Sequence, residues 1–552
     1  MCRCTSLVLL LTVVLLVSTS AGEELPRDWP MWGGTSHRNN ATAARAAPLD
    51  WDMGGFARET GRWQREKSRN IKWAARLGSQ TYGTPVVADG RIFIGTNNAA
   101  GYIERYPPGV DLSCLLCFRE RDGEFLWQLS CEKLKTGRAN DWPMQGLCST
   151  PLVERGRLWV VTNRCELLCL NTKGNDDGEA DVVWRIDMWN DLGVRPHNMS
   201  SCSPAGWRNL LFVVTGNGVD ASHIDIPAPD APSFIAVDKD MGHIVWKDNS
   251  PGKNILHGQW GSPAAGVLGG MPQVIFPGGD GWLYSFHAEK YEGGKPILLW
   301  KFDANAKESK WILGGRGRRN NIVCMPLIHN GRVYFTVGQD PEHGEGYGAL
   351  YCLDPTKRGD VSAELVVRGK VHGNARTEIV PPRRNQAVRA DLGEAVIENP
   401  NSAVVWKYEG FDLDCDGKLE FFEQMHRAIA TPVIKDDLLF INDFSGLLHC
   451  VDISTGRSRW TADLLAMTWA SPLLVNDHVY IGDEDGDIAI VKADADPRLS
   501  LKLSNKSDPT DIFGEPLREM YMHNSVYTTP VMANGVLYIA NRTHLFAIEV
   551  EK

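Results

Sequence analysis

A short phrase recurs eight times along this chain and constrains its fold more than any other feature. The phrase consists of a Thr/Ser-Pro step, an apolar run with a turn, a VYIG-like stretch, a Gly turn, an LYCLD-like stretch and a Trp. The repeat prolines are Pro85, Pro151, Pro204, Pro263, Pro326, Pro432, Pro472 and Pro530. Alternating β-branched and aromatic residues bounded by Gly or Asp are typical of half-buried strands joined by tight hairpins. The sequence therefore predicts a β-repeat architecture.

Tryptophan-containing stretches indicate how the repeat array ends. Six repeats end on such a stretch, with Trp127, Trp184, Trp246, Trp300, Trp406 and Trp460. We expect IKWAARL (71–77), which precedes the first repeat and carries Trp73, to complete the eighth repeat. Pairing the two ends of the chain leaves no terminal sheet edge unpaired. The predicted fold is therefore an all-β, eight-bladed β-propeller over residues 71–552, closed by an N-terminal strand, with 355–400 as a decorated loop of the fifth blade.

Three stretches carry a resemblance to a known family. LLHCVDISTGRSRW (447–460) and FIAVDKDMGHIVW (234–246) follow one pattern, and DWPMWGG (28–34) opens the mature chain. These stretches resemble the exported quinoprotein-like (PQQ-like) β-propeller repeat proteins, which are related to the outer-membrane assembly-factor propellers. The resemblance implies the propeller fold over nearly the whole mature chain. For function it implies two classes, a binding or assembly scaffold and a dehydrogenase that uses pyrroloquinoline quinone (PQQ).

The first 21 residues have the pattern of a secretory signal peptide. Arg3 precedes an apolar run from Leu7 to Val17, and small residues lead to Ala21, after which we expect cleavage. An uncleaved anchor is the alternative, but the run has 11 residues, whereas a bilayer span needs about 20. We therefore predict an exported protein, periplasmic or extracellular, with an N-terminal extension at residues 22–70.

Composition and charge exclude some functions. The net charge of −10 means that the surface repels phosphate groups on average, so nucleic-acid binding is not expected. With 43% hydrophobic and 23% charged residues, the chain has a globular composition. We expect a monomer without a membrane span. Thirteen Cys are present, and the eleven that remain after loss of Cys2 and Cys4 cannot form a complete disulfide framework, because their number is odd.

Four cysteines occupy one slot of the repeat: Cys117, Cys169, Cys352 and Cys450. In other repeats Phe286 and Ala236 are expected to fill this slot. A slot that accepts Phe or Ala favours packing, so we predict buried thiols. Metal-ligand or redox pairs, such as Cys165 with Cys169 or Cys114 with Cys117, are the alternative.

A ring of polar residues is expected around the axial channel, because the first strand of each blade is the innermost one. The ring positions, six residues before each repeat proline, are Ser79, Gln145, Asn198, His257, Asn320, His426, Ala466 and Asn524. Neighbouring candidates are Arg319, Arg427, His197, His523, Trp260, Trp469 and Tyr527. Such a ring can orient a small polar ligand. In the alternative, amides and ordered water satisfy inward-facing backbone groups and no ligand binds.

The groups that the resemblance implies for a quinone-dependent dehydrogenase are largely missing. An adjacent Cys-Cys pair, which stacks under the cofactor in those enzymes, does not occur in this sequence. The polar ring contains no Asp or Glu to act as a general base or to bind the calcium of the cofactor. Hydrolase, P-loop and zincin motifs are also absent. We therefore expect a non-catalytic scaffold for a protein or a small polar ligand, and a PQQ-dependent oxidoreductase is the alternative.

Residues 412–423, DLDCDGKLEFFE, match the EF-hand calcium loop at every template position. Asp412, Asp414 and Asp416 would supply side-chain oxygens, Lys418 its carbonyl, Glu420 a direct or water-bridged ligand, and Glu423 a bidentate carboxylate. The loop lies within an insertion at 409–427 between the fifth and sixth blades, and 419–427 is expected to form a short helix. Because a strand precedes the loop, we predict a structural calcium site and not a sensor. An acidic turn that binds nothing is the alternative.

Overall fold

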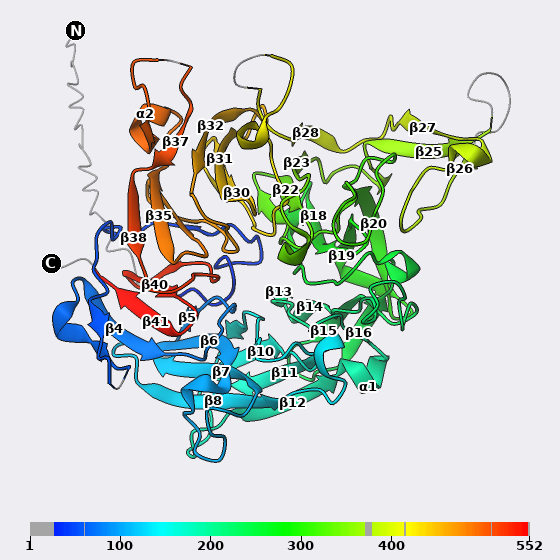
Figure 1. The fold of residues 1–552 in the computed structure, drawn as a ribbon. Helices are drawn as coiled ribbons and strands as arrows, with labels where there is room; N and C mark the ends of the chain where they lie inside the picture. Colours follow the sequence, from blue (N-terminus) through cyan, green and yellow to red (C-terminus); the bar gives the residue numbers. More distant parts are fainter. Residues whose placement is uncertain (1–26, 60, 370–377, 413–415, 509, 550–552) are drawn as a thin grey trace, which may run out of the picture.

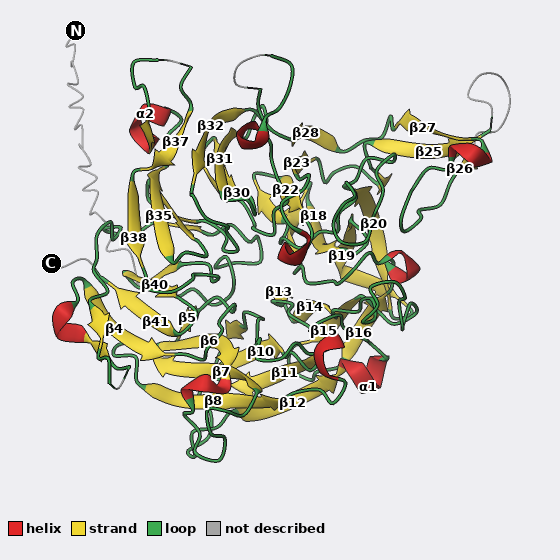
Figure 2. Ribbon diagram, in the orientation of Figure 1, coloured by secondary structure: helices red, strands yellow, loops and turns green. Residues whose placement is uncertain are grey.

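A computed structural model describes residues 27–59, 61–369, 378–412, 416–508 and 510–549. The predicted signal peptide lies outside these residues. The strands form ten sheets, and eight of these sheets have four or more strands. Each of the eight sheets contains a short strand that directly follows one repeat proline. The all-β prediction is confirmed, and Figures 1 and 2 show the sheets arranged around a common centre.

In the first four of these sheets, consecutive strands pair antiparallel. Their strands are β5 (Val86–Ala88), β6 (Arg91–Asn97), β7 (Leu112–Arg119) and β8 (Phe125–Glu132); β9 (Leu152–Glu154), β10 (Arg157–Val161), β11 (Glu166–Asn171) and β12 (Asp181–Asp187); β13 (Ala205–Trp207), β14 (Leu210–Val214), β15 (Phe234–Asp238) and β16 (Ile244–Asp248); and β17 (Ala264–Leu268), β18 (Met271–Pro277), β19 (Trp282–Glu292) and β20 (Lys295–Asp303). The middle strands are apolar on both faces because each sheet packs against a neighbour on either side.

The last four sheets follow the same plan, and two of them, those of the sixth and seventh repeats, have more than four strands. Their strands are β21 (Leu327–His329), β22 (Arg332–Val337), β23 (Ala349–Leu353) and β28 (Val404–Tyr408); β29 (Val433–Lys435), β30 (Leu438–Asn442), β31 (Leu447–Asp452), β32 (Ser458–Asp463), β36 (Leu501–Leu503) and β37 (Phe513–Pro516); β1 (Ala41–Thr42), β33 (Leu473–Val475), β34 (His478–Gly482), β35 (Asp487–Lys492) and β38 (Arg518–Tyr521); and β39 (Val531–Ala533), β40 (Val536–Ala540), β41 (His544–Ile548) and β4 (Ile71–Arg76). The seventh repeat, which lacks a Trp strand, is completed by β38.

The predicted pairing of the chain ends is confirmed, because β4 pairs antiparallel with β41. Trp73 Nε1 donates a hydrogen bond to the Glu120 carbonyl of the first repeat at 3.0 Å. Trp127 of the first repeat makes the equivalent bond to the Thr172 carbonyl of the second repeat, also at 3.0 Å. Trp73 therefore holds the place of an eighth repeat Trp.

The repeat glycine lies against the Trp of the preceding repeat. Gly456 has a φ of +71°, and a Cβ there would lie 2.6 Å from the Trp406 ring. Gly123 stands in the same relation to Trp73, at 2.5 Å. No L-residue fits such an approach, so glycine lets each sheet press directly onto the neighbouring indole.

The cysteine slot lies opposite the repeat Trp, and a β-bulge follows it. All four slot cysteines are buried, and none of them forms a disulfide, as predicted. The residue that faces Trp300 in the fourth sheet is Ser285. The prediction that Phe286 fills this slot was wrong, because Phe286 lies past the bulge and pairs with Leu298. Ser and Cys are similar in size, so the slot stays a site for small side chains.

Residues 27–42 form a collar along the inner ends of the sheets (Figure 1, dark blue). The collar exchanges hydrogen bonds with the residue two positions after the repeat proline in seven repeats. These partners are Val87, Val153, Gly206, Ala265, Ile328, Ile434 and Leu474. In the eighth repeat, Asn534 N–H donates to the Arg27 carbonyl at 3.2 Å. A single short segment therefore touches every repeat.

The long connection between β23 and β28 carries four strands of its own. Its strands are β24 (Gly359–Asp360), β25 (Glu364–Arg368), β26 (Glu378–Ile379) and β27 (Glu394–Glu398). β24 adds to the fourth sheet beside β20, and the other three form a separate small sheet. Sequence analysis predicted only a decorated loop here, because the strands are short and lack the repeat phrase.

Within the described residues, helical structure is limited to short turns. The helices are α1 (Met188–Leu192) and α2 (Pro497–Ser500), and the 3₁₀ turns are η1 (Arg65–Lys67), η2 (Asn98–Ala100), η3 (Gly137–Ala139), η4 (Gly252–Asn254), η5 (Pro341–His343), η6 (Ala390–Leu392) and η7 (Phe421–Glu423). A two-stranded sheet of β2 (Gly55–Phe56) and β3 (Trp63–Gln64) lies in the N-terminal extension. Among the described residues, no helix has the length and apolar character needed to cross a bilayer.

Candidate functional site

One central cavity of about 210 Å³ is lined by equivalent residues of all eight repeats. These residues directly precede the repeat prolines and are Thr84, Thr150, Ser203, Ser262, Met325, Thr431, Ser471 and Thr529. Seven of the eight carry a hydroxyl group, and we call the set the hydroxyl ring. The repeat phrase thus begins with a residue that faces the common centre of the fold.

The hydroxyl ring is held together by hydrogen bonds between neighbouring repeats. The backbone N–H of each member donates to the side-chain hydroxyl of the next, at 2.9–3.4 Å, in seven of eight steps. The exception is the step from Ser262 to Met325, because Met carries no hydroxyl. Most hydroxyls that face the cavity are therefore already acceptors within the protein.

Arg38 of the collar lies next to the hydroxyl ring and is fully buried. Its guanidinium donates to the carbonyls of Pro263 and Ser203, both at 2.9 Å, and to the Trp32 carbonyl at 3.2 Å. Burial lowers the pKa of Arg38 to about 10, so the group stays cationic at neutral pH. Arg38 therefore ties the collar to two repeats through backbone carbonyls.

Aromatic side chains line another part of the cavity. Tyr82 and Tyr527 stack with ring centroids 4.9 Å apart, and the predicted residue Trp469 lies 5.2 Å from Tyr527. None of the described residues that line the cavity is acidic or basic. PQQ carries several carboxylates, and buried carboxylates need cationic partners. The lining therefore does not fit PQQ.

Three predicted residues, Asn320, His426 and Arg427, are held by internal hydrogen bonds. The Arg427 guanidinium donates to four backbone carbonyls and to Asn320 Oδ1. Asn320 also donates to the Tyr347 carbonyl at 2.9 Å. His426 Nδ1 lies 2.9 Å from Asp443 Oδ2, and although burial raises the pKa of Asp443, His426 and His449 together hold it well below the usual range. At these positions the polar groups satisfy protein partners.

The other predicted polar residues are dispersed. Arg319 is buried and donates to Asp303 Oδ2 at 3.0 Å. Asn524 Oδ1 accepts from Ser525 N–H at 3.0 Å. Gln145 and Asn198 are half-buried, and Asn198 has a left-handed backbone with a φ of +61°. The structure does not bring these four side chains together into one site.

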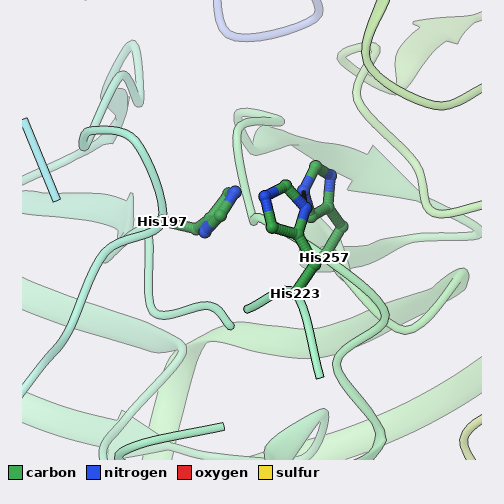
Figure 3. Close-up of side chains that lie close together, drawn as sticks. All are labelled: His197, His223 and His257. Carbon is green, nitrogen blue, oxygen red and sulfur yellow. Dashed lines mark hydrogen bonds between the residues drawn. The ribbon is translucent and has the colours of Figure 1, made fainter. Parts of the chain in front are cut away.

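A histidine cluster is the densest group of potential ligands among the described residues, and it consists of His197, His223, His257, Asp340 and His343. The ligand atoms of the first three lie within 4.8 Å of one another, and those of His257, Asp340 and His343 do so as well. Figure 3 shows the rings of His223 and His257 side by side and His197 opposite them. The His197 ring centroid lies 4.4 Å from that of His257 and 4.7 Å from that of His223.

The two nitrogens of His257 have different neighbours. Nε2 lies 2.9 Å from His223 Nδ1, whereas Nδ1 lies 2.6 Å from Asp340 Oδ2. The same carboxylate oxygen lies 3.3 Å from His343 Nδ1. Burial raises the pKa of Asp340, but His257, His343 and His197 together outweigh this effect and leave the pKa below the ordinary value. A carboxylate therefore lies against the far nitrogen of the His257 ring.

His197 is oriented by a backbone carbonyl. Its Nδ1 lies 3.0 Å from the Val219 carbonyl, so Nδ1–H donates and Nε2 carries the lone pair. Nε2 is buried and has no hydrogen-bond partner among the described residues. Burial, together with the nearby His257, lowers the pKa of His197 to about 3, so the ring is neutral at physiological pH.

The cluster is built from loops at one end of three neighbouring sheets. His197 and His257 precede the first strands of the third and fourth sheets, His223 lies between β14 and β15, and Asp340 and His343 lie between β22 and β23. Antiparallel strands alternate in direction. The loop that precedes the first strand of a sheet therefore lies at the same end of the sheet as the loop between its second and third strands. The topology thus brings side chains 146 positions apart into one site.

Sequence analysis placed His257, His197 and Trp260 near the channel, and the structure brings these three together. Trp260 Nε1 donates to the His197 carbonyl at 3.1 Å, and its ring centroid lies 5.2 Å from that of His257. His223, Asp340 and His343 were missed, because they belong to loops that the repeat phrase does not include. His223 has a φ of +63°, a strained conformation for a His residue that is visible only in the structure.

The EF-hand-like loop lies between β28 and β29, as predicted. Gly417 has a φ of +84° and donates its N–H to Asp412 Oδ2 at 2.9 Å, which forms the expected sharp turn. Glu423 Oε2 accepts from Glu420 N–H at 2.8 Å. Asp414 lies outside the described residues. The helix predicted at 419–427 is only the three-residue turn η7, because β-bridges at Gln424 and His426 end it.

Comparison with known proteins gives a local match to one family. Residues 393–501 match a family model described as outer membrane protein assembly factor BamB. The chain is also 32% identical over 71 residues to outer membrane protein assembly factor BamB of Shewanella oneidensis. That match spans 12% of this chain and 18% of the relative. The resemblance to PQQ-like propeller repeat proteins is confirmed.

Two solved structures align with most of this chain at low sequence identity. BamB from Moraxella catarrhalis aligns with a TM-score of 0.47 and 12% identity, over 87% of this chain and 96% of that chain. Quinohemoprotein alcohol dehydrogenase from Comamonas testosteroni aligns with a TM-score of 0.44 and 12% identity, over 95% of this chain and 81% of that chain.

Proposed function

We propose that this chain is an exported, monomeric, non-catalytic scaffold built as a closed eight-bladed propeller. The pairing of β4 with β41, the bond from Trp73 to the first repeat and the hydroxyl ring all support closure. The hydroxyl ring is the main observation that supports a non-catalytic function. Its hydroxyls are used between blades, and the described lining of the cavity has no ionisable side chain from Lys, Arg, Asp, Glu or His to act as a general base.

The scaffold function also draws on the local match to an outer membrane protein assembly factor. We propose that this chain binds a protein partner in the same cell envelope, after removal of residues 1–21. Phe421 and Phe422 of the insertion offer an apolar surface for this partner, because Phe421 is 51% exposed and Phe422 is 38% exposed. Exposed aromatic side chains grouped in one turn are typical of contact sites.

Cofactor reconstitution tests the absence of catalysis. The full chain is incubated with PQQ and Ca²⁺, freed of unbound cofactor, and assayed for cofactor absorbance and for dye reduction with alcohols and sugars. We expect no stoichiometric PQQ and no turnover. Bound PQQ with turnover would establish the oxidoreductase and overturn the scaffold.

Crosslinking in the envelope of the native host tests the partner. A photo-reactive residue at Phe422 is expected to capture a specific protein of the outer-membrane assembly machinery. The matched control is the same residue at Val267 in β17, which is 55% exposed and lies in another sheet. Equal capture from both positions would contradict the proposed surface.

We also propose one structural calcium ion in the loop at 412–423. Asp412 Oδ1 is buried and has no hydrogen-bond partner among the described residues, as expected for an oxygen that binds a cation. Glu423, at the last position of the loop template, is also buried. Such an ion would fasten the connection between the fifth and sixth sheets.

A further inference from the structure

We infer that the histidine cluster is a zinc site in which His197 Nε2, His223 Nδ1 and His257 Nε2 are the metal ligands. This inference does not depend on the scaffold function. The site lies outside the central cavity, where loops of the third and fourth repeats converge. Three nitrogens from three separate loop segments meet there.

The first observation is an unsatisfied nitrogen at a buried position. His197 is 1% exposed, its Nε2 has no partner among the described residues, and its ring faces those of His223 and His257 (Figure 3). A buried polar atom without a partner costs about 1–3 kcal/mol, so such atoms are rare in folded proteins. A metal ion between the three rings would give this nitrogen its partner.

The second observation is that the far nitrogens of two ligands have outer contacts, which are a hydrogen bond for His197 and a close ion-pair contact without hydrogen-bond geometry for His257. His257 Nδ1 faces Asp340 Oδ2 at 2.6 Å, and His197 Nδ1 faces the Val219 carbonyl at 3.0 Å. Metal-bound histidines characteristically donate their second N–H to a carboxylate or a backbone carbonyl, which fixes the tautomer and aims the free nitrogen at the ion. The hydrogen bond of His197 therefore leaves its Nε2 facing the other two rings, and the Asp340 carboxylate lies on the far side of the His257 ring.

The spacing suits a small tetrahedral ion. Zinc–nitrogen bonds of about 2.0–2.1 Å in a tetrahedron place the nitrogens about 3.3 Å apart. The separation of His223 Nδ1 and His257 Nε2 is 2.9 Å, and all three ligand atoms lie within 4.8 Å of one another. Small rotations of the rings would bring the set to this geometry. Imidazole ligands select zinc and its transition-metal neighbours over calcium or magnesium.

The surroundings position the ligand loops from outside. Arg384, from the long insertion in the fifth repeat, donates to the carbonyls of Ile224 and Leu256, which are next to His223 and His257 in sequence. Arg427 donates to the His343 carbonyl at 2.7 Å. The insertion and the inner arginine thus hold the loops that present the nitrogens. With three protein ligands, the fourth position of the zinc ion is left for water or a small ligand.

Zinc titration of the full chain tests the inference. The protein is stripped with a chelator, and Zn²⁺ alone is titrated by calorimetry in the variant Asp412→Ala/Glu423→Gln, which removes the acidic loop as a competing site. We expect one equivalent of zinc to bind. His223→Ala should weaken binding by more than about 100-fold, whereas Asp340→Asn, which removes an outer partner, should weaken it by about 10- to 100-fold.

Controls separate lost ligands from lost structure. His243→Ala, at an exposed histidine outside the cluster, should leave zinc binding unchanged. Each variant is checked by its melting curve, and His223→Asn, which keeps a polar side chain, replaces His223→Ala if the latter does not fold. Cobalt substitution should give the intense visible absorption of a tetrahedral site, and this absorption should disappear in the His223 variant.

Two results would overturn the inference. One is the absence of stoichiometric zinc binding in the stripped, folded protein. The other is undiminished zinc binding by His223→Ala together with complete loss in Asp340→Asn, since this result would place the ion between His257, Asp340 and His343.

Discussion

The backbone N–H of Thr529 donates a hydrogen bond to Thr84 Oγ1 at 3.4 Å, across 445 positions of the sequence. This bond joins the last member of the hydroxyl ring to the first, in the same way that Thr84 N–H bonds to Thr150 Oγ1 at 3.2 Å. The last and first repeats are thus joined in the same way as two consecutive repeats.

Trp73→Ala should destabilise the protein about as much as a large-to-small change in any other repeat. Trp73 is buried and bonds to the Glu120 carbonyl, so the expected loss is about 3–5 kcal/mol in the free energy of unfolding. Urea unfolding measures the loss, with Trp127→Ala as the matched control between consecutive repeats. A loss below about 1 kcal/mol for Trp73 alone would show that the ends of the chain contribute little to stability.

Gly456→Ala should cost more than the same change at a glycine with open space around it. Both Gly456 and Gly535 have a left-handed backbone, with φ of +71° and +80°, but only at Gly456 would a Cβ collide with a ring, that of Trp406. Gly535→Ala therefore isolates the backbone strain of about 1 kcal/mol. The excess loss at Gly456, expected to be at least about 2 kcal/mol, measures the contact between sheets. Equal losses would contradict the role assigned to the repeat glycine.

Met325→Thr should complete the hydroxyl ring. The new hydroxyl would face Ser262 N–H at the one step where the ring is interrupted, and an added hydrogen bond contributes about 0.5–1.5 kcal/mol. Met325→Val is the control, because Val has the shape of Thr without the hydroxyl. Chemical denaturation should find Met325→Thr more stable than Met325→Val, and the reverse order would show that this gap prefers an apolar side chain.

Acid should weaken the pairing of β4 with β41 through His544. Burial, and to a lesser extent Arg76, lowers the pKa of His544 to about 4. The unfolded chain therefore binds a proton between about pH 6.5 and 4 that the folded chain does not, so stability falls as pH drops through this window, by about 3 kcal/mol. The difference in unfolding free energy between wild type and His544→Gln, measured from pH 7 to 4, isolates this contribution. A difference that does not vary with pH would contradict the prediction.

Calcium should raise the melting temperature of the wild type. A chelator should lower that temperature, whereas the variant Asp412→Ala/Glu423→Gln should melt at the same temperature with and without the chelator. Loss of the ion would remove its stabilisation of the connection between β28 and β29, because an ion that binds only the folded state raises stability. Calorimetry on the stripped protein should detect one calcium site with weak competition from Mg²⁺. An unchanged wild-type melt together with no heat of binding would leave the loop as an acidic turn.

The strands, the order of the repeats and the pairing of β4 were predictable because one phrase places its Pro, Gly and Trp at fixed points in every sheet. The hydrogen-bond partners of individual polar residues were not predictable. Arg427 and His426 looked like ligands in the sequence, yet Arg427 is bonded to loop carbonyls and His426 to Asp443. Their partners come from other repeats or later strands, at distances that no local pattern encodes.

The histidine cluster was only half predictable for a related reason. His197 and His257 precede repeat prolines at similar distances, so the phrase places them near the centre. His223 and Asp340 lie in loops whose lengths differ from repeat to repeat. These residues come close to His197 and His257 only because all of these loops lie at the same end of their sheets. Loop residues of this kind carry chemistry that repeat symmetry does not reveal.

The collar has a consequence for how the chain acquires its structure during synthesis. Residues 27–42 are among the first to be made, yet their hydrogen-bond partners extend to Leu474 and Asn534 near the end of the chain. Early repeats can form their own hairpins, but residues 27–42 lack some of their hydrogen-bond partners until the eighth repeat has been synthesised. The final step of folding is therefore late, involves contacts of very high sequence separation, and leaves the nascent protein dependent on protection from aggregation until then.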